Sequence, residues 1–193
     1  MERPHIKPAQ ARARRDRDRG APTQSAVIVS VGAAEGVVGG FRADLDPAAA
    51  LGVPAHVTVI APFVPPHLID GTLLAALAET VRSVSAFDAA FARVAWFADT
   101  VAWLAPEPSA PFRELTEVVW ARFPDYPPYR GIYDDIVPHL TIGENSGLSD
   151  MRAAAQVIER SLPIMTRVDR VTLIQGSAAA ASWRTVAELP LAG

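Results

Sequence analysis

Two short segments of the chain pair a histidine with a threonine two residues later, HVT at 56–58 and HLT at 139–141. Alternate side chains of a β-strand lie on one face, so an extended segment presents each histidine beside its threonine. The aliphatic residue between them then faces the opposite way and can pack in a core. An imidazole and a hydroxyl without partners are costly to bury, so we expect both polar faces to border a wet cleft.

Two imidazoles and two hydroxyls that converge on one cleft suit the chemistry of a phosphoester. A neutral histidine can take a proton from an attacking water or hydroxyl, and a protonated one can give a proton to the leaving oxygen. Thr58 and Thr141 can donate hydrogen bonds to the non-bridging phosphate oxygens, where charge builds up in the transition state. The near symmetry of the motifs leaves open whether His56 or His139 is the base.

Three other interpretations of the motifs compete with this one. The histidines could be structural groups at strand starts, with threonines present for their β propensity. The cleft could bind a nucleotide or a phosphorylated small molecule without turning it over. The histidines could also bind zinc together with a carboxylate. The chain has no H-x-x-x-H or H-E-x-x-H spacing, and neither motif contains an acidic residue. We therefore expect no metal and no other cofactor.

The elements expected around the motifs repeat once along the chain. Apolar periodicity and capping residues predict two successive β-α-β-α-β units and a final strand. The fold class is therefore α+β and bilobal, a pseudo-two-fold duplication with lobes at about 25–98 and 99–193, in which each lobe has an antiparallel-containing sheet and one His-x-Thr strand facing a central cleft. The expected strands are 25–31, 56–63, 87–97, 100–105, 139–142, 164–174 and 183–189, and the expected helices are 34–46, 66–84, one capped by Ser109 and one capped by Ser149.

The segments HVTVIAPF at 56–63 and PHLTIGE at 138–144 resemble the paired signatures of the two-histidine (2H) phosphoesterase superfamily, in particular its 2′-5′ RNA ligase-like branch. The resemblance implies a bilobal α+β fold. It also implies metal-independent action on 2′,3′-cyclic phosphates, 2′-5′ linkages or related cyclic phosphoesters, with reverse 2′-5′ ligation open to the same groups. By this resemblance His56 and His139 would be the acid and base, and Thr58 and Thr141 would hold the phosphate.

Four further residues are candidates for contacting a substrate. All three tyrosines lie in the loop before the second motif, and Tyr129 and Tyr133 flank Arg130. A tyrosine there can stack on a nucleobase while the arginine meets a phosphate. The competing interpretation is a proline-pinned loop whose rings cover the core. Phe63, just beyond the first motif, could wall the cleft or lie in the core.

The distribution of charge limits the partners. Residues 1–24 hold seven basic and three acidic residues, whereas the rest of the chain holds eleven arginines, no lysine and eighteen acidic residues. An acidic body is a poor surface for extended nucleic acid, so we expect a small cyclic nucleotide or an RNA-end phosphoester. The basic tail is expected to be a disordered extension, with a weak RNA-contacting arm as the alternative.

We expect a monomer, and the remaining composition fits a reducing, cytoplasmic setting. The chain has no cysteine, which excludes disulfides, thiolate metal sites and a cysteine nucleophile. Its apolar runs fall short of the roughly 18 residues that suggest a membrane span. No apolar core region follows the basic N-terminal residues, so they do not form a secretory signal.

Overall fold

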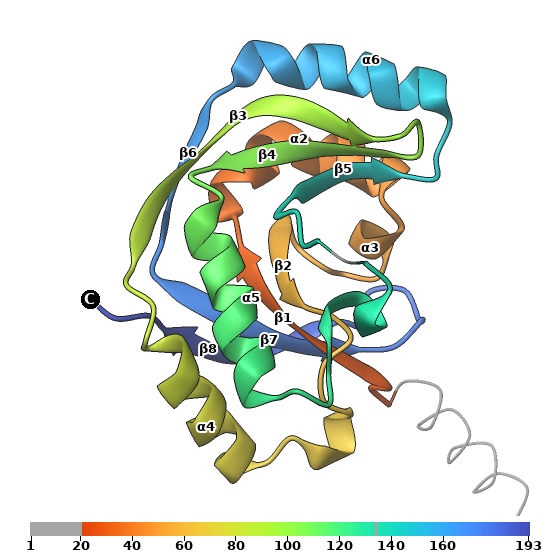
Figure 1. Cartoon of the computed structure of the whole chain (residues 1–193). Coiled ribbons are helices and arrows are strands. Elements are labelled where there is room, and N and C mark those ends of the chain that lie inside the picture. The colour runs from red at the N-terminus through yellow and green to blue at the C-terminus, as the bar shows by residue number, and fades with distance from the viewer. Residues whose placement is uncertain (1–20, 134) are drawn as a thin grey trace, which may run out of the picture.

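The strands form one strongly curved sheet (Figure 1) in the computed structural model, which describes residues 21–133 and 135–193. The expectations for the basic tail fall almost entirely outside these residues. Within them the sheet has eight strands in the order β6-β3-β4-β5-β2-β1-β7-β8, all paired antiparallel. The strands are β1 (Gln24–Ser30), β2 (His56–Ile60), β3 (Phe87–Phe97), β4 (Val101–Glu107), β5 (Leu140–Glu144), β6 (Ile164–Val168), β7 (Arg170–Gly176) and β8 (Arg184–Pro190).

The helices are α2 (Gly32–Leu45), α3 (Pro47–Ala50), α4 (Gly71–Val81), α5 (Ala110–Arg122) and α6 (Leu148–Ile158). Helices α2, α4, α5 and α6 contribute buried residues to the core on the face of the sheet opposite to the motif histidines. Helix α3 packs instead through Ala48 against a smaller cluster that includes Ile28, which pairs with Thr58 and so lies on the histidine side. Helix α2 packs on β5, and α5 packs on β2. Each of these helices therefore supports the motif strand of the other half of the chain, which ties the two motifs into one core.

The core is built from the aliphatic residues that alternate with the motif side chains. Val57, Val59, Leu140 and Ile142 are all at most 2% exposed. They belong to one large cluster that also contains the inward faces of the helices. Burial of an aliphatic side chain of this size contributes about 1.5–3 kcal/mol, so the pattern fixes which face of each motif strand turns to the core.

The two halves of the sheet are not the two halves of the chain. The predicted lobe boundary between 98 and 99 separates β3 from β4, but these strands pair with each other. Strands β7 and β8, from the end of the chain, extend the half that contains β1 and β2. Each half of the sheet nevertheless starts from a motif strand at the centre, an order consistent with the expected pseudo-two-fold duplication.

Several predicted element boundaries differ from the structure for local reasons. The helix expected from residue 66 is a 3₁₀ turn followed by α4, which begins after Asp70, whose Oδ1 accepts a hydrogen bond from the Leu73 N–H at 2.9 Å. The strand predicted at 164–174 is two strands separated at Asp169. Gly147, and not Ser149, precedes α6. At each of these boundaries a residue that favours turns (Asp70, Asp169 or Gly147) sets where the element begins or ends, rather than the apolar pattern.

A β-bulge in β5 interrupts the alternation of its side chains. Thr141 lies opposite Trp103 on β4, but Gly143 lies opposite Ala102 and Glu144 opposite Val101. The extra residue turns Gly143 toward the core and returns Glu144 to the face that carries Thr141. A Cβ atom at position 143 would lie 2.9 Å from Leu45 Cβ. The tight packing of α2 and α6 therefore requires glycine here.

We predict that Gly143→Ala lowers the free energy of unfolding by about 1–3 kcal/mol, the usual effect of an added methyl group in a packed core. Urea denaturation would measure it. The control is Gly40→Ala on the exposed side of α2, where a Cβ meets nothing within 4 Å. That change should leave stability unaltered or raise it by up to about 1 kcal/mol. Equal stability of Gly143→Ala and the unaltered protein would contradict the packing described.

Candidate active site

The two motif strands are neighbours at the centre of the sheet. Val57 of β2 lies directly opposite Leu140 of β5 in an antiparallel pair. This register sets His56 across from Thr141 and Thr58 across from His139. The structure thus brings the four sequence-predicted residues onto one face of two adjacent strands. Their side chains are half-buried, whereas the residues between them are fully buried. We call this the motif face.

Both imidazoles are fixed by the same local hydrogen bond. The Nδ1 atom of His56 lies 2.7 Å from the carbonyl oxygen of Pro54, and that of His139 lies 2.7 Å from the carbonyl oxygen of Val137. A carbonyl oxygen can only accept, so each Nδ1 carries a proton and donates it. The neutral rings therefore keep an unprotonated Nε2, which can exchange a proton with a bound substrate.

The backbone that leads into His56 is held by a buried ion pair between Arg42 of α2 and Asp46, the residue that follows α2. Arg42 and Asp46 are 2% and 3% exposed. The guanidinium donates from Nη2 to Asp46 Oδ2 at 2.8 Å and to the carbonyl oxygen of Val53 at 3.2 Å. The Ala55 N–H donates to Glu35 Oε1 at 2.6 Å. Side chains of α2 thus fix both ends of the 53–55 segment, and with it the carbonyl group that orients His56.

Aromatic rings enclose His139 instead. Its ring meets Phe97 edge-on, with 5.0 Å between centroids, and lies 5.9 Å from Trp103. Phe97 and Trp103 stack on each other at 4.7 Å. Neither residue could be predicted from the sequence as part of the site, because the pairing that places Trp103 beside Thr141 on one face is a property of the folded sheet. The alternation of side chains within residues 100–105 shows which of them share a face, but it does not show that this strand lies next to the second motif strand.

Burial makes both histidines weak bases in the free protein. The pKa of His56 is lowered from 6.5 to about 4, mainly by desolvation, which outweighs the hydrogen bond to Pro54; the Arg42 cation lowers the pKa and its partner Asp46 raises it. Desolvation also lowers the pKa of His139, opposed by the hydrogen bond to Val137 and by the Glu144 carboxylate. Both rings are therefore neutral at pH 7.

The loop that precedes the second motif and contains the three tyrosines reaches the motif face at Tyr129. Its phenol interacts with the Thr58 hydroxyl, and burial raises its pKa. The Tyr129 N–H donates to the carbonyl oxygen of Ala61 at 2.8 Å. Tyr129 and Arg130 adopt φ angles of 50° and 59°, an uncommon left-handed conformation for residues with a side chain. Tyr133 stacks edge-on against Tyr129 at 5.6 Å and is 64% exposed, and Arg130 is also exposed.

Phe63 does not wall the site as one interpretation predicted. It is 3% exposed and packs edge-on against Phe123 at 5.2 Å and Tyr126 at 5.8 Å. Strand β2 ends at Ile60, before Pro62, and the chain then turns Phe63 into the core. The loop tyrosines thus divide between the two interpretations, since Tyr126 helps to cover the core and Tyr129 reaches the motif face.

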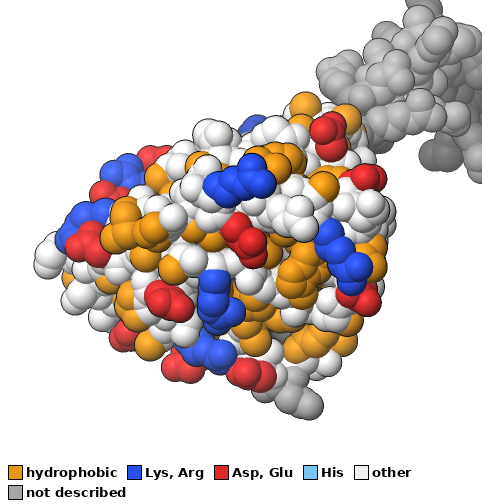
Figure 2. Space-filling model, turned by 90° about the horizontal axis from the view of Figure 1, so that it is seen from above, with side chains coloured by type: hydrophobic (Ala, Val, Ile, Leu, Met, Phe, Trp, Pro, Cys, Tyr) orange, Lys and Arg blue, Asp and Glu red, His pale blue; other side chains and the backbone are white. Residues whose placement is uncertain are grey.

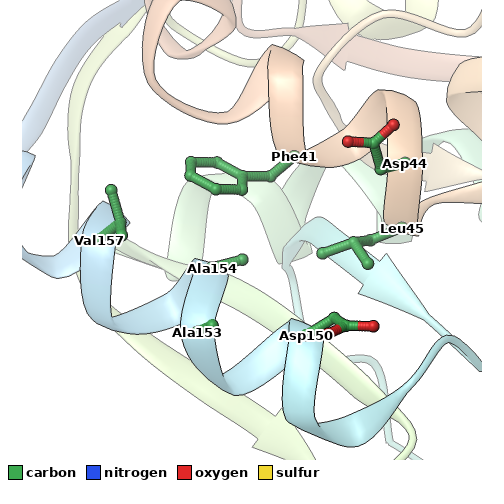
Figure 3. Close-up of a pocket in the computed structure, with 7 residues that line it drawn as sticks. All are labelled: Phe41, Asp44, Leu45, Asp150, Ala153, Ala154 and Val157. Atoms are coloured by element: carbon green, nitrogen blue, oxygen red, sulfur yellow. The ribbon is translucent and has the colours of Figure 1, made fainter.

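Two pockets lie beside the motif face and behind it. One of about 270 Å³ lies next to the second motif and is lined by Arg93, Trp103, Ala105, Pro106, Glu107, Ser109, Arg113, Val137 and Pro138. The other, of about 430 Å³, lies between α2 and α6 on the helix side of the sheet (Figure 3). Its apolar lining includes Phe41 and Leu45, and Asp44 and Asp150 lie at its rim.

The surface above α6 carries mixed charge. Figure 2 shows basic and acidic side chains interspersed with apolar ones on this face. Within residues 21–133 and 135–193, no three His, Cys, Asp or Glu side chains cluster closely enough to hold a metal ion. None of the helices in that part of the chain is long and apolar enough to cross a membrane.

Comparisons with known proteins agree with the geometry. A model of the 2′-5′ RNA ligase superfamily matches residues 29–179. No curated protein matches the chain. Among solved structures, Escherichia coli LigT complexed with 3′-AMP is 16% identical with a TM-score of 0.54, and 90% of this chain covers 100% of that one. A structure described as a phosphoesterase is 15% identical with a TM-score of 0.58 and the same coverage. The protein TT0787 of Thermus thermophilus is 16% identical with a TM-score of 0.57, covering 88% of this chain and 98% of that one. These likenesses show a shared fold.

We predict that both motif histidines are Nδ1-protonated tautomers at pH 7 and that His56 titrates near pH 4. Its protonation is unfavourable because the imidazolium would lose hydration beside the Arg42 cation. Nitrogen-15 NMR of the imidazole rings measures both tautomer and titration midpoint. An Nε2-protonated ring, or a His56 midpoint near 6.5, would contradict this description of the site.

Proposed function

We propose, because this chain belongs to the 2′-5′ RNA ligase superfamily, that it is a metal-independent phosphoesterase. Its substrate would be a 2′,3′-cyclic phosphate, a 2′-5′ linkage or a related cyclic phosphoester of RNA or a small nucleotide. The observation that carries the proposal is the pair of imidazoles on adjacent strands, each anchored through Nδ1 and each across from a threonine hydroxyl. A phosphate between them would meet two nitrogen and two hydroxyl groups.

In the proposed reaction one ring acts as base and the other as acid. We assign the base to His56, because burial lowers its pKa to about 4 and so disfavours its imidazolium, and the acid to His139, because the Glu144 carboxylate favours protonation there. His56 Nε2 takes a proton from water as its oxygen forms the new bond to phosphorus. His139 Nε2 gives its proton to the departing ribose oxygen. The same steps in the same direction, with a hydroxyl of a second ribose in place of water, would open the cyclic phosphate and join a 2′-5′ linkage, with the proton from His139 going to the ribose oxygen that leaves phosphorus.

Three hydroxyl groups would stabilise the charge on the phosphate. Thr58 and Thr141 lie across from the two imidazoles, where they can donate to non-bridging oxygens. Tyr129, whose phenol contacts Thr58, remains a neutral donor because burial raises its pKa. Tyr133 and Arg130 lie close to Tyr129 in the sequence and are exposed, where a nucleobase could reach them.

The proposed substrate is small. Structures of Escherichia coli LigT with 3′-AMP, ATP and NADP⁺ show that a protein of the same fold accepts nucleotides. The excess of acidic residues beyond residue 24 favours a nucleotide or an RNA end over extended nucleic acid. We propose that the protein acts in the cytoplasm, since a chain without cysteine suits a reducing compartment, and that it acts as a monomer.

We predict that His56→Ala and His139→Ala each lower kcat on a 2′,3′-cyclic nucleotide by roughly 10²–10⁴, because each removes a positioned acid or base. Phosphorus NMR of a panel of cyclic phosphates would follow product formation. His67→Ala, at an exposed position in the 3₁₀ turn, is the matched control and should retain activity. Binding across the panel with no turnover by the unaltered protein would favour a non-catalytic binding module. Full turnover by either motif variant would refute the role of that histidine.

We also predict that kcat/KM rises as the pH falls from 8 toward 6 and is highest below pH 6.5. The reactive form has one imidazole protonated, and the lowered pKa values of both rings make that form scarce at neutral pH. A lower pH increases its population until the second ring is also protonated, near pH 4 for His56. Steady-state rates at low substrate concentration measure the profile. An optimum above pH 7 would contradict the proposed protonation states.

A further inference from the structure

Glu144 reaches the motif face only because of the bulge in β5. In a regular strand it would follow His139 and Thr141 on the opposite, core-facing side. The register instead pairs Thr141 with Trp103 and Glu144 with Val101, two residues of β4 that lie on the same face. Ile142 and Gly143 between them both point toward the core, where Ile142 is 0% exposed and Gly143 packs against Leu45. The bulge therefore places the Glu144 carboxylate on the motif face, after His139 and Thr141 along the strand.

The surroundings of Glu144 leave its charge uncompensated. Its Oε1 accepts a hydrogen bond of 3.4 Å from the neutral Asn145 amide. Among the described residues, no arginine or lysine nitrogen lies within 4.0 Å of its carboxylate. Its charge acts on both His139 and Tyr129, which places it within electrostatic reach of the motif face. By contrast, the Arg42 charge behind His56 is paired with Asp46.

We propose that Glu144 determines substrate specificity: its carboxylate accepts hydrogen bonds from the hydroxyl groups of an uncharged sugar and repels any second phosphate beside the reacting one. A carboxylate is an acceptor only, so it matches ribose hydroxyls, and two like charges close together are unfavourable. The preferred substrate class is then a nucleoside 2′,3′-cyclic phosphate with a free 5′-hydroxyl, in which the reacting phosphate is the sole anion. This inference deepens the proposed function and rests on it.

The test compares two substrates that differ by one phosphate, adenosine 2′,3′-cyclic phosphate with a 5′-hydroxyl and the same compound with a 5′-phosphate. We expect the unaltered protein to prefer the 5′-hydroxyl form in kcat/KM, and Glu144→Gln to reduce that preference roughly tenfold, an effect between those of a 4 Å like-charge contact in bulk water and near a protein surface. Salt should weaken the preference of the unaltered protein. Glu159→Gln, at an exposed acidic position after α6, is the matched control and should keep the preference.

Two further measurements separate this inference from the proposed function. The affinity for inorganic phosphate, measured by calorimetry, should rise in Glu144→Gln whether or not the protein catalyses anything. NMR titration should show the pKa of His139 falling in the same variant, since the carboxylate raises it, while the pKa of His56 stays unchanged. If the unaltered protein turns over no substrate, but Glu144→Gln still raises the phosphate affinity and lowers the pKa of His139, the proposed function is refuted and the charge effect of Glu144 is supported. An unchanged substrate preference in an active protein, or unchanged phosphate affinity and His139 pKa, would overturn the inference.

Discussion

The contact between Val57 and Leu140 at the centre of the sheet is the constraint on which the site depends. Both side chains are at most 1% exposed, and their burial fixes the face and the register of β2 and β5 together. A slip of one residue in either strand would turn a histidine and a threonine into the core and an aliphatic residue out. The hydrophobic effect on one side of the sheet therefore positions the polar groups on the other. Helices α2 and α5, each packed on the other half's motif strand, hold this contact from behind.

The two motifs share a geometry but differ in their surroundings. Both histidines donate from Nδ1 to the carbonyl two residues earlier, which is a local consequence of an extended chain entering a strand. His56 lies in front of the buried Arg42–Asp46 pair, whereas His139 lies among aromatic rings with a carboxylate in electrostatic reach. A near-symmetric pair of groups thereby acquires unequal proton affinities, which is what an acid and a base acting in one step require.

The sequence was sufficient to predict the α+β class, the order of most elements and the four motif residues on one face. These follow from periods of two and 3.6 residues and from the cost of burying polar groups, which are local properties. Strand order is a property of the whole chain, so the pairing of β3 with β4 and of β7 with β1 did not follow from it. The bulge that re-aims Glu144 and the turn that buries Phe63 break a local alternation, and they arise from packing against residues far along the chain. The role of Arg42 was hidden for the same reason, because its partner groups are fixed only once α2 and the segment after it fold together.

A crystal structure with bound inorganic phosphate would show whether the two imidazoles share one anion. We expect one phosphate within hydrogen-bonding distance of the Nε2 atoms of both His56 and His139, with the Thr58 and Thr141 hydroxyls on its remaining oxygens. A phosphate that binds elsewhere while the motif face stays empty, or that contacts a single histidine with the other ring turned away, would contradict this expectation.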